Sequence, residues 1–303
     1  MATFSTPTGA ARLMLITVLS LFGLKVAVGV LTGSISIWAQ AADSSLDIFA
    51  VIITFLTVGY SVKPADQEHP FGHGKIEDIS AAIQAILLLG AVIAIDYSAI
   101  LRIIHGETLQ LTETGIAVML FSLVVNIFLS RYLFRVARAT GSVALEANAH
   151  NIRGDIYSTS GVFVGLVVVR ITGIIILDPI IALAVSLLIL RAAYQVGKMA
   201  FSGLIDVKLP KEEEEALMSL LMEHEQQFVG VHRVRTRHSG SQHYVDLHMV
   251  MPKGTSVEKA HEMCDHLEED IGKKLTNASI TIHVEPCDNT CSQCRVIDCD
   301  FRK

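Results

Sequence analysis

The sequence predicts an α-helical membrane protein with six transmembrane helices, followed by a small α+β domain. Of its 303 residues, 51% are hydrophobic and 18% are charged, and the mean hydropathy of +0.49 is too high for an ordinary soluble enzyme. Six apolar stretches are each long enough to cross a bilayer, which takes about 20 helical residues. After Asp206 the sequence becomes polar, which indicates a second domain. The net charge of -6 gives no indication of nucleic-acid binding.

The membrane domain is expected to comprise residues 1–206. Its spans are expected near residues 12–32, 34–60, 79–104, 114–137, 144–170 and 174–199. The N-terminus lacks a small-residue cleavage site after a short apolar core, so the first stretch is interpreted as a retained span. Basic residues gather on one side of the predicted helices, and the positive-inside rule therefore places both chain ends in the cytoplasm. These residues are Arg12, Lys63, Lys75, Arg131, Arg135, Arg138 and Lys198.

Residues 207–286 are predicted to form a soluble domain, and residues 287–303 a cysteine-rich tail. Two segments of the domain have the spacing of helices, and three have the pattern of strands. In chain order they are a helix at 211–226, strands at 231–238 and 244–251, a helix at 256–275 with Ser256 as its candidate cap, and a strand at 278–285. The order α-β-β-α-β is typical of an open-faced sandwich.

Two aspartates, Asp43 and Asp47, interrupt the second apolar stretch, where a charge costs about 2.5–3.5 kcal/mol on insertion scales. They are four residues apart and therefore share one face of a helix. Asp155 begins the apolar part of the fifth stretch, and Asn151 lies one turn before it. These four side chains could form an oxygen-ligand site for a divalent cation. The alternative is that the aspartates cap helices or bind water in a polar crevice.

The loop between the second and third stretches, KPADQEHPFGHGKIED, offers a second candidate site. Asp66, His69 and His73 supply a carboxylate and two imidazoles at short spacing. Glycine and proline residues among them bend the backbone, so the three side chains can converge. Such a set is similar to an incomplete tetrahedral zinc shell. A surface turn with histidines present by chance is the alternative.

The soluble domain is rich in histidine and its tail in cysteine. His232, His248, His261 and His283 fall on three predicted strands and one helix, and neutral imidazoles are good ligands for transition metals. Each one alone is more often an exposed or packed side chain than a metal ligand. The tail has metal-ligand spacing at one pair of cysteines, with two more nearby, although a tail of reactive thiols fits as well. These cysteines are Cys287, Cys291, Cys294 and Cys299.

Taken together, these residues resemble the cation diffusion facilitator family of divalent metal transporters from about residue 10 to residue 286. The most specific segments are ADSSLD (42–47), KPADQEHPFGHGKIE (63–77) and ANAHNIRGD (147–155), followed by VRTRHSG, DLHMVM and TIHVEP. The resemblance implies a homodimer in a lipid bilayer, with six spans per subunit and a ferredoxin-like, metallochaperone-like cytoplasmic domain. It also implies an integral protein of a bacterial-type inner (plasma) membrane that exports a divalent metal in exchange for protons.

The resemblance assigns residues to three metal sites and one salt bridge. The transport site would contain Asp43, Asp47, Asp155 and the position held by Asn151. The loop site would contain Asp66, His69 and His73. The cytoplasmic site would contain His232, His248, His261 and His283, with Glu285 at a position where an aspartate can also occur. An interlocking salt bridge near the membrane surface would join Lys75 to Asp206.

One position departs from the pattern of zinc transporters in this family, which usually have histidine where this chain has Asn151. The histidine here is His150, about 100° around the helix, and it would reach the site only if the helix rotated or unwound. An all-oxygen site favours Mn²⁺ or Fe²⁺ relative to Zn²⁺, whereas the histidine-rich domain favours Zn²⁺. The expected substrate and regulatory ligand is therefore a divalent transition metal, with zinc slightly ahead of manganese and iron.

The expected mechanism couples the two ions through the same carboxylates, because metal binding displaces protons and later protonation expels the metal. A passive channel and a non-transporting metal sensor or scaffold are the alternatives, and the missing ligand at Asn151 keeps the sensor or scaffold open. An enzyme is not expected, because the sequence has no Ser–His pair, HExxH or GxSxG motif.

Overall fold

The computed structural model describes residues 6–287, apart from residues 33–34, 106–112, 175 and 276. The chain divides into two compact units, residues 1–202 and 203–303, and each is described separately.

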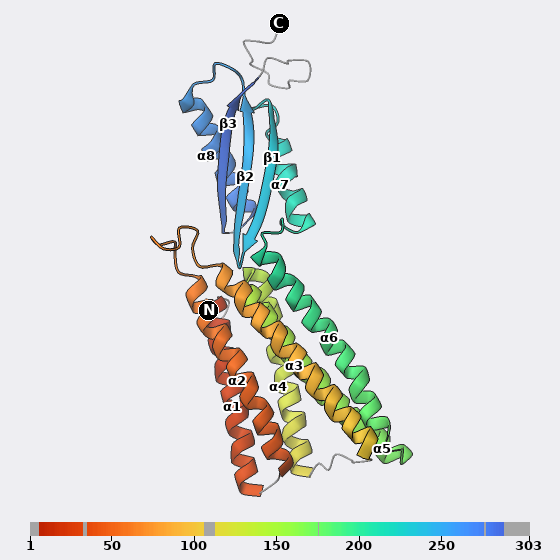
Figure 1. The fold of residues 1–303 in the computed structure, drawn as a ribbon. Helices are drawn as coiled ribbons and strands as arrows, with labels where there is room; N and C mark the ends of the chain where they lie inside the picture. Colours follow the sequence, from red (N-terminus) through yellow and green to blue (C-terminus); the bar gives the residue numbers. More distant parts are fainter. Residues whose placement is uncertain (1–5, 33–34, 106–112, 175, 276, 288–303) are drawn as a thin grey trace. The chain divides into compact units, whose positions relative to one another are not determined.

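The first unit is built from long helices that correspond to the six predicted spans (Figure 1). They are α1 (Pro7–Thr32), α2 (Ile35–Ser61), α3 (Lys75–His105), α4 (Glu113–Thr140), α5 (Val143–Thr172) and α6 (Leu177–Leu204). Five of these helices contain a stretch long and apolar enough to cross a membrane, and the described part of α2 adds the shorter apolar segment Asp47–Ser61. The predicted helical membrane domain is thereby confirmed.

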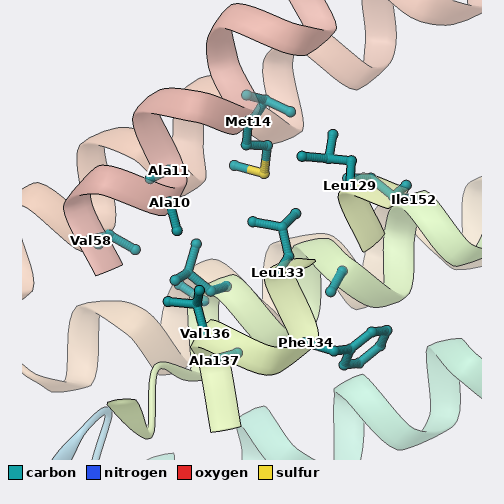
Figure 2. Close-up of a cluster of buried hydrophobic side chains, with 14 of the residues drawn as sticks. Ala10, Ala11, Met14, Val58, Leu129, Leu133, Phe134, Val136, Ala137 and Ile152 are labelled. Atoms are coloured by element: carbon teal, nitrogen blue, oxygen red, sulfur yellow. The ribbon is translucent and has the colours of Figure 1, made fainter. Parts of the chain in front are cut away.

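A buried apolar cluster joins α1, α2, α4 and α5 (Figure 2). Met14 of α1 and Leu133 of α4 are completely buried in it, next to Val58 of α2 and Ile152 of α5. Small residues such as Ala10 let the helices approach closely, which is how helices associate in lipid. A second cluster joins α3, α5 and α6.

The outward surface of these helices carries large apolar side chains. Ile93, Phe128 and Leu187 are each at least 65% exposed, which would be costly in water but suits contact with acyl chains. The narrow buried stripes and the apolar exterior are those of an integral membrane protein.

The carboxylate of Glu77 ties three helix ends together inside the first unit. It is 1% exposed and accepts hydrogen bonds from Ser61 Oγ at 2.8 Å and from Ser142 Oγ at 2.9 Å. It also accepts a bond from the backbone N–H of Ala144 at 3.3 Å. Ser142 is the N-cap of α5, so Glu77 satisfies backbone and hydroxyl donors at a buried helix start.

The second unit has the predicted order α-β-β-α-β (Figure 1). Its elements are α7 (Lys211–Glu223), β1 (Gly230–Ser239), β2 (Gln242–Met251), α8 (Val257–Lys274) and β3 (Ala278–Pro286). The sheet order is β1-β2-β3, with β1 antiparallel and β3 parallel to β2. The parallel pair requires a crossover connection, which α8 supplies. Ser256 caps α8 as predicted, since its hydroxyl accepts a hydrogen bond from Lys259 N.

One face of this sheet packs on the two helices, and the other carries polar side chains. Along β2, Val245, Leu247 and Met249 are buried in a cluster with Leu267 and Ile271 of α8. Because side chains alternate between the faces of a strand, the residues between them lie on the opposite face. This alternation sets His248 of β2 and His283 of β3 on the surface that the helices do not cover.

Candidate metal sites

Three histidines form a row across the polar face of the sheet. His248 of β2 is paired in register with His232 of β1 on one side and with His283 of β3 on the other. Their ring centroids are 5.3 Å apart for His232 and His248, and 4.7 Å apart for His248 and His283. The strand pairing therefore brings together three imidazoles that are distant in sequence.

Glu285 lies on the same face and completes this group. Its Oε1 atom is 2.8 Å from His248 Nδ1 and 3.7 Å from His283 Nε2, and its Oε2 atom is 3.2 Å from His232 Nε2. The hydrogen bond from His248 holds the pKa of Glu285 below its ordinary value, so the carboxylate stays ionised at neutral pH. The ligand atoms of His232, His248 and Glu285 all lie within 4.8 Å of one another, as a shared metal ion would require.

His261, the fourth histidine expected at this site, lies elsewhere in the subunit. It is on α8, which packs against the opposite face of the sheet, and its Nδ1 atom is 3.4 Å from Asp265. A single subunit therefore does not bring His261 to the histidine row. In the tail, Cys287 is a free thiol next to β3, and Cys291, Cys294 and Cys299 lie outside the described residues.

The loop between α2 and α3 gathers Asp66, His69 and His73. Asp66 Oδ1 accepts backbone hydrogen bonds from Glu68 at 3.0 Å and His69 at 2.7 Å, which closes a tight turn. Asp66 Oδ1 also lies 3.1 Å from His69 Nδ1, and its Oδ2 atom lies 3.4 Å from His73 Nε2. Gly72 adopts a φ of 76°, which favours glycine, so the chain can reverse between the two histidines. The backbone N–H of His69 holds the pKa of Asp66 below its ordinary value.

His73 is the buried member of this loop group. Its side chain is 1% exposed and packs edge-on against Tyr60, with ring centroids 4.9 Å apart. Among the described residues, no group hydrogen-bonds either ring nitrogen of His73. A buried imidazole usually has a partner, and a metal ion bound together with Asp66 and His69 would supply one.

The aspartates expected at the intramembrane site lie on two helices that contact each other. Ile48, next to Asp47 on α2, and Ile156, next to Asp155 on α5, pack against the same apolar cluster. Both aspartates are half-buried, as is Asn151 one turn before Asp155. The side chain of Asp43 is not among those described. Among the described residues, several sets of three acidic or histidine side chains lie close enough together to share a metal ion. Neither Asp47 nor Asp155 belongs to such a set.

His150 belongs to a different part of the bundle. Its ring packs edge-on against Phe134 of α4 at 4.9 Å, and Arg153 lies over the same phenyl ring at 4.1 Å. These side chains line a pocket of about 310 Å³ between α4, α5 and α6, together with Arg138 and Glu146. Its ring is thus part of the α4–α5–α6 pocket, and it gives no support for a nitrogen ligand beside Asp47.

A buried polar group near the aspartates does not appear among the sequence predictions. Thr54 Oγ1 accepts hydrogen bonds from Gln84 Nε2 at 2.8 Å and from Asn148 Nδ2 at 3.1 Å, which links α2, α3 and α5. Asn148 and Asn151 are three residues apart on α5, so both lie on neighbouring turns of the same helix face. The signal was available in the sequence, because polar amides inside apolar stretches are uncommon.

The salt bridge between Lys75 and Asp206 remains a prediction, because the two residues belong to different units. Within its own unit, Asp206 Oδ1 lies 3.3 Å from Arg237 Nη1. The backbone of Asp206 is left-handed, with a φ of 57°, which ends the helical path after α6.

Comparison with known proteins identifies the class of this protein. Residues 11–205 match the family of cation efflux transmembrane domains, and residues 209–287 match the family of cation efflux protein cytoplasmic domains. The chain therefore belongs to the cation efflux family, which is the cation diffusion facilitator family expected from its motifs. Members of this family are transporters rather than enzymes.

Named relatives agree with this membership. The cation-efflux pump FieF of Pectobacterium atrosepticum is 33% identical over 268 residues, which cover 88% of this chain and 89% of the relative. The uncharacterized transporter sll1263 of Synechocystis is 30% identical over 271 residues, covering 89% and 87% of the two chains. A solved structure of CzrB in its Zn form is 36% identical and covers 27% of this chain and 92% of its own, with a TM-score of 0.26.

Proposed function

We propose that this protein exports a divalent transition metal from the cytoplasm in exchange for protons, with zinc slightly favoured over manganese and iron. The observation that carries the proposal is the presence of Asp47 and Asp155 on two contacting helices of a cation efflux transmembrane domain. Carboxylates inside a membrane bundle are costly and mark ion pathways. Together with Asp43 and Asn151 they would form a four-ligand transport site.

The same carboxylates would couple the metal to protons. On the cytoplasmic side, the dication would bind the ionised aspartates and displace their protons. After the bundle rearranges, protons from the outer side would neutralise Asp47 and Asp155 and release the metal. Because both ions compete for one set of oxygens, each ion lowers the affinity of the site for the other.

The remaining sites would act on the cytoplasmic side. We infer that residues 1–206 are the transport domain in an inner (plasma) membrane, with both termini in the cytoplasm and residues 207–286 as a metal-binding domain. The sheet site of His232, His248, His283 and Glu285 and the loop site of Asp66, His69 and His73 would bind regulatory metal. His261 of α8 is exposed within its own subunit. In a homodimer it would supply a ligand only to a site of the other subunit.

The choice of metal follows from the donor atoms. The proposed transport site would have only oxygen ligands, which favour Mn²⁺ and Fe²⁺ more than imidazole does. The packing of His150 against Phe134 supports its absence from that ligand set. The sheet and loop sites are rich in imidazole, which favours Zn²⁺. Substituting Asn151→His should therefore raise the preference for Zn²⁺ over Mn²⁺ in flux measurements.

Flux through proteoliposomes tests the proposal. The full chain is reconstituted with a metal-sensitive dye inside the vesicles, and Zn²⁺, Mn²⁺ or Fe²⁺ is added outside with and without an acidic lumen. We expect an acidic lumen to accelerate metal uptake by the correctly oriented fraction. Asp155→Asn should remove this flux, whereas the matched control Asp96→Asn, an aspartate of α3 that is outside the proposed site, should keep it.

Each other outcome has a definite meaning. Flux in Asp155→Asn equal to that of the parent protein would refute the transport site. A metal flux that is the same with and without the pH gradient would indicate a passive channel. Metal binding without flux for any of the three metals would favour a sensor or scaffold.

A further inference from the structure

A third group of metal-ligating side chains lies between the two helices of the second unit, apart from the sheet and loop sites. His224 follows the last residue of α7, and His266 and Asp270 lie one turn apart on α8. The Nε2 atoms of the two histidines are 3.2 Å apart. Asp270 Oδ2 is 3.4 Å from His224 Nε2 and 3.6 Å from His266 Nε2.

The orientation of His224 is set by the helix that precedes it. Its Nδ1 atom lies 3.0 Å from the carbonyl oxygen of Leu220, so Nδ1 carries a proton and donates a hydrogen bond to that carbonyl. Nε2 is then the ring nitrogen that faces His266 and Asp270 and is placed to bind a metal ion. A backbone carbonyl that fixes the tautomer in this way is a common support for histidine ligands of zinc.

Asp270 is also prepared for a cation. Its Oδ1 atom accepts a hydrogen bond from Lys273 Nζ at 3.0 Å, which leaves Oδ2 pointing at the two imidazoles. That bond keeps the pKa of the carboxyl low, so the group is ionised at neutral pH. The side chains of His224, His266 and Asp270 are 12%, 50% and 23% exposed, so an ion from solvent can reach the group.

The three separations match a tetrahedral zinc ion. Ligand atoms about 2.0–2.2 Å from zinc at tetrahedral angles lie about 3.3–3.6 Å from one another. The separations between the ligand atoms in the structure are 3.2, 3.4 and 3.6 Å. We propose that His224, His266 and Asp270 bind a divalent transition metal, best Zn²⁺ with water as its fourth ligand, and that this ion clamps the end of α7 to α8 within one subunit.

This site is distinct from transport and does not depend on the proposed function. The same helix provides an internal comparison, because His261 and Asp265 have the same spacing of four residues as His266 and Asp270. Within the described residues, the converging groups include the second pair, which has His224 as a third ligand, and do not include the first. A histidine and an aspartate four residues apart on α8 are therefore not enough to form a three-ligand group. The third ligand, His224, is supplied by the end of α7.

The test counts zinc ions bound to the full-length protein in detergent. Protein stripped with a chelator is dialysed against buffered Zn²⁺ at the lowest free concentration that saturates the parent chain, and the zinc content is measured by mass spectrometry. We expect His266→Gln and Asp270→Asn each to lose one zinc per chain. The double variant should also lose only one, because the two residues share one ion. Asp265→Asn is the matched control and should lose none.

A second measurement reads the clamp itself. Zinc should slow amide hydrogen exchange by about tenfold or more at the end of α7 in the parent protein and in Asp265→Asn, but not in Asp270→Asn. Full zinc content in both His266→Gln and Asp270→Asn would overturn the proposal. So would an equal loss of zinc in Asp265→Asn, or zinc-independent exchange at α7 in the parent.

Discussion

Glu77, at the start of α3, accepts hydrogen bonds from residues at the ends of two other helices. Replacing it with alanine leaves the hydroxyls of Ser61 and Ser142 and the N–H of Ala144 without their buried acceptor. Leaving a buried donor without its acceptor costs about 1–3 kcal/mol, so we expect Glu77→Ala to lower the free energy of unfolding by at least about 2 kcal/mol. The fraction of protein that stays monodisperse in detergent after heating measures this loss.

Glu113→Ala is the matched control for this change. Glu113 also lies in the first turn of a long helix, but its side chain is exposed. Substitutions at exposed positions change stability by about 0.5 kcal/mol or less. Equal heat sensitivity of the two variants would show that the buried hydrogen bonds of Glu77 are not what stabilises the three helix ends.

His238 makes the stability of the second unit depend on pH. Burial, and then the nearby His243, lowers the pKa of His238 below its ordinary value of 6.5, although Glu213 and Asp206 act in the opposite direction. The unfolded chain therefore binds the proton at a higher pH than the folded chain does. The stability from neutral His238 is complete above pH 6.5 and is lost as the pH falls from 6.5 through the lowered folded pKa.

We expect His238→Gln to flatten this dependence. The readout is the maleimide labelling rate of Cys264, a thiol buried in the core of the second unit, measured by peptide mass spectrometry. With metal chelated, the ratio of the variant's rate to the parent's rate should fall as the pH drops below 6.5. His261→Gln replaces an exposed histidine and should leave the ratio constant. A constant ratio for His238→Gln would contradict the assignment.

The candidate sites differ in how far residues alone could indicate them. Asp66, His69 and His73 lie within one short loop, so their convergence follows from local turn chemistry. The row of His232, His248 and His283 depends on strand register, which alternation suggests but does not fix. The group at His224 was not predicted, because it depends on where α7 ends and on how α7 packs against α8.

At the level of elements, the close contact of α5 and α6 near Gly161 depends on the absence of a side chain on this glycine. A Cβ atom built on Gly161 would lie 2.6 Å from Val185 Cγ2, which is too close for any real contact. Val185 is β-branched and cannot easily turn away. We expect Gly161→Ala to force the helices apart and to cost about 1–3 kcal/mol, seen as reduced monodispersity after heating.

Gly90→Ala is the control at this scale. Nothing lies within 4 Å of a Cβ atom built on Gly90 of α3, so the added methyl group meets no obstacle within the described chain. Alanine also favours a helix over glycine by about 1 kcal/mol in water. Gly90→Ala should therefore be as heat-resistant as the parent, and heat resistance of Gly161→Ala would refute close packing at that position.

The elements themselves were largely predictable, and their ends were not. Long apolar runs and strict alternation are strong signals, and each predicted helix and strand has its counterpart. The helix predicted to reach residue 226 ends at Glu223, because His224 leaves the helical path and acts as its cap. In β1, a bulge between His232 and Arg235 interrupts the pairing with β2, and Arg233 there has a φ of 52°. The amino-acid composition of the strand does not predict this bulge.

For the whole molecule, metal is expected to stabilise the second unit. The sheet group takes one ligand from each strand, so an ion bound there holds all three strands together. A ligand that binds only the folded form stabilises it by about 2.7 kcal/mol at one hundred times its dissociation constant. Zinc at that concentration should slow the labelling of Cys264 roughly 100-fold, and a chelator should reverse the effect.

His248→Ala tests whether the sheet group is responsible. His248 lies at the centre of the histidine row, and its loss should reduce the effect of zinc on the labelling rate by tenfold or more. His243→Gln, on the same strand but paired with Glu213, should keep the full effect. A zinc effect that is the same in both variants would assign the stabilisation to another site.

The pairing of His248 with His283 also bears on how β3 finds its place beside β2. Side chains alternate between the faces of a strand, so a register shift of one residue would place His283 and Glu285 in the hydrophobic core. The same shift would expose Ile282 and Val284 to water. The polar side chains thus penalise a misaligned strand during assembly. An ion that bridges the three strands would bind only when the strands are in the correct register, and it would then stabilise that register.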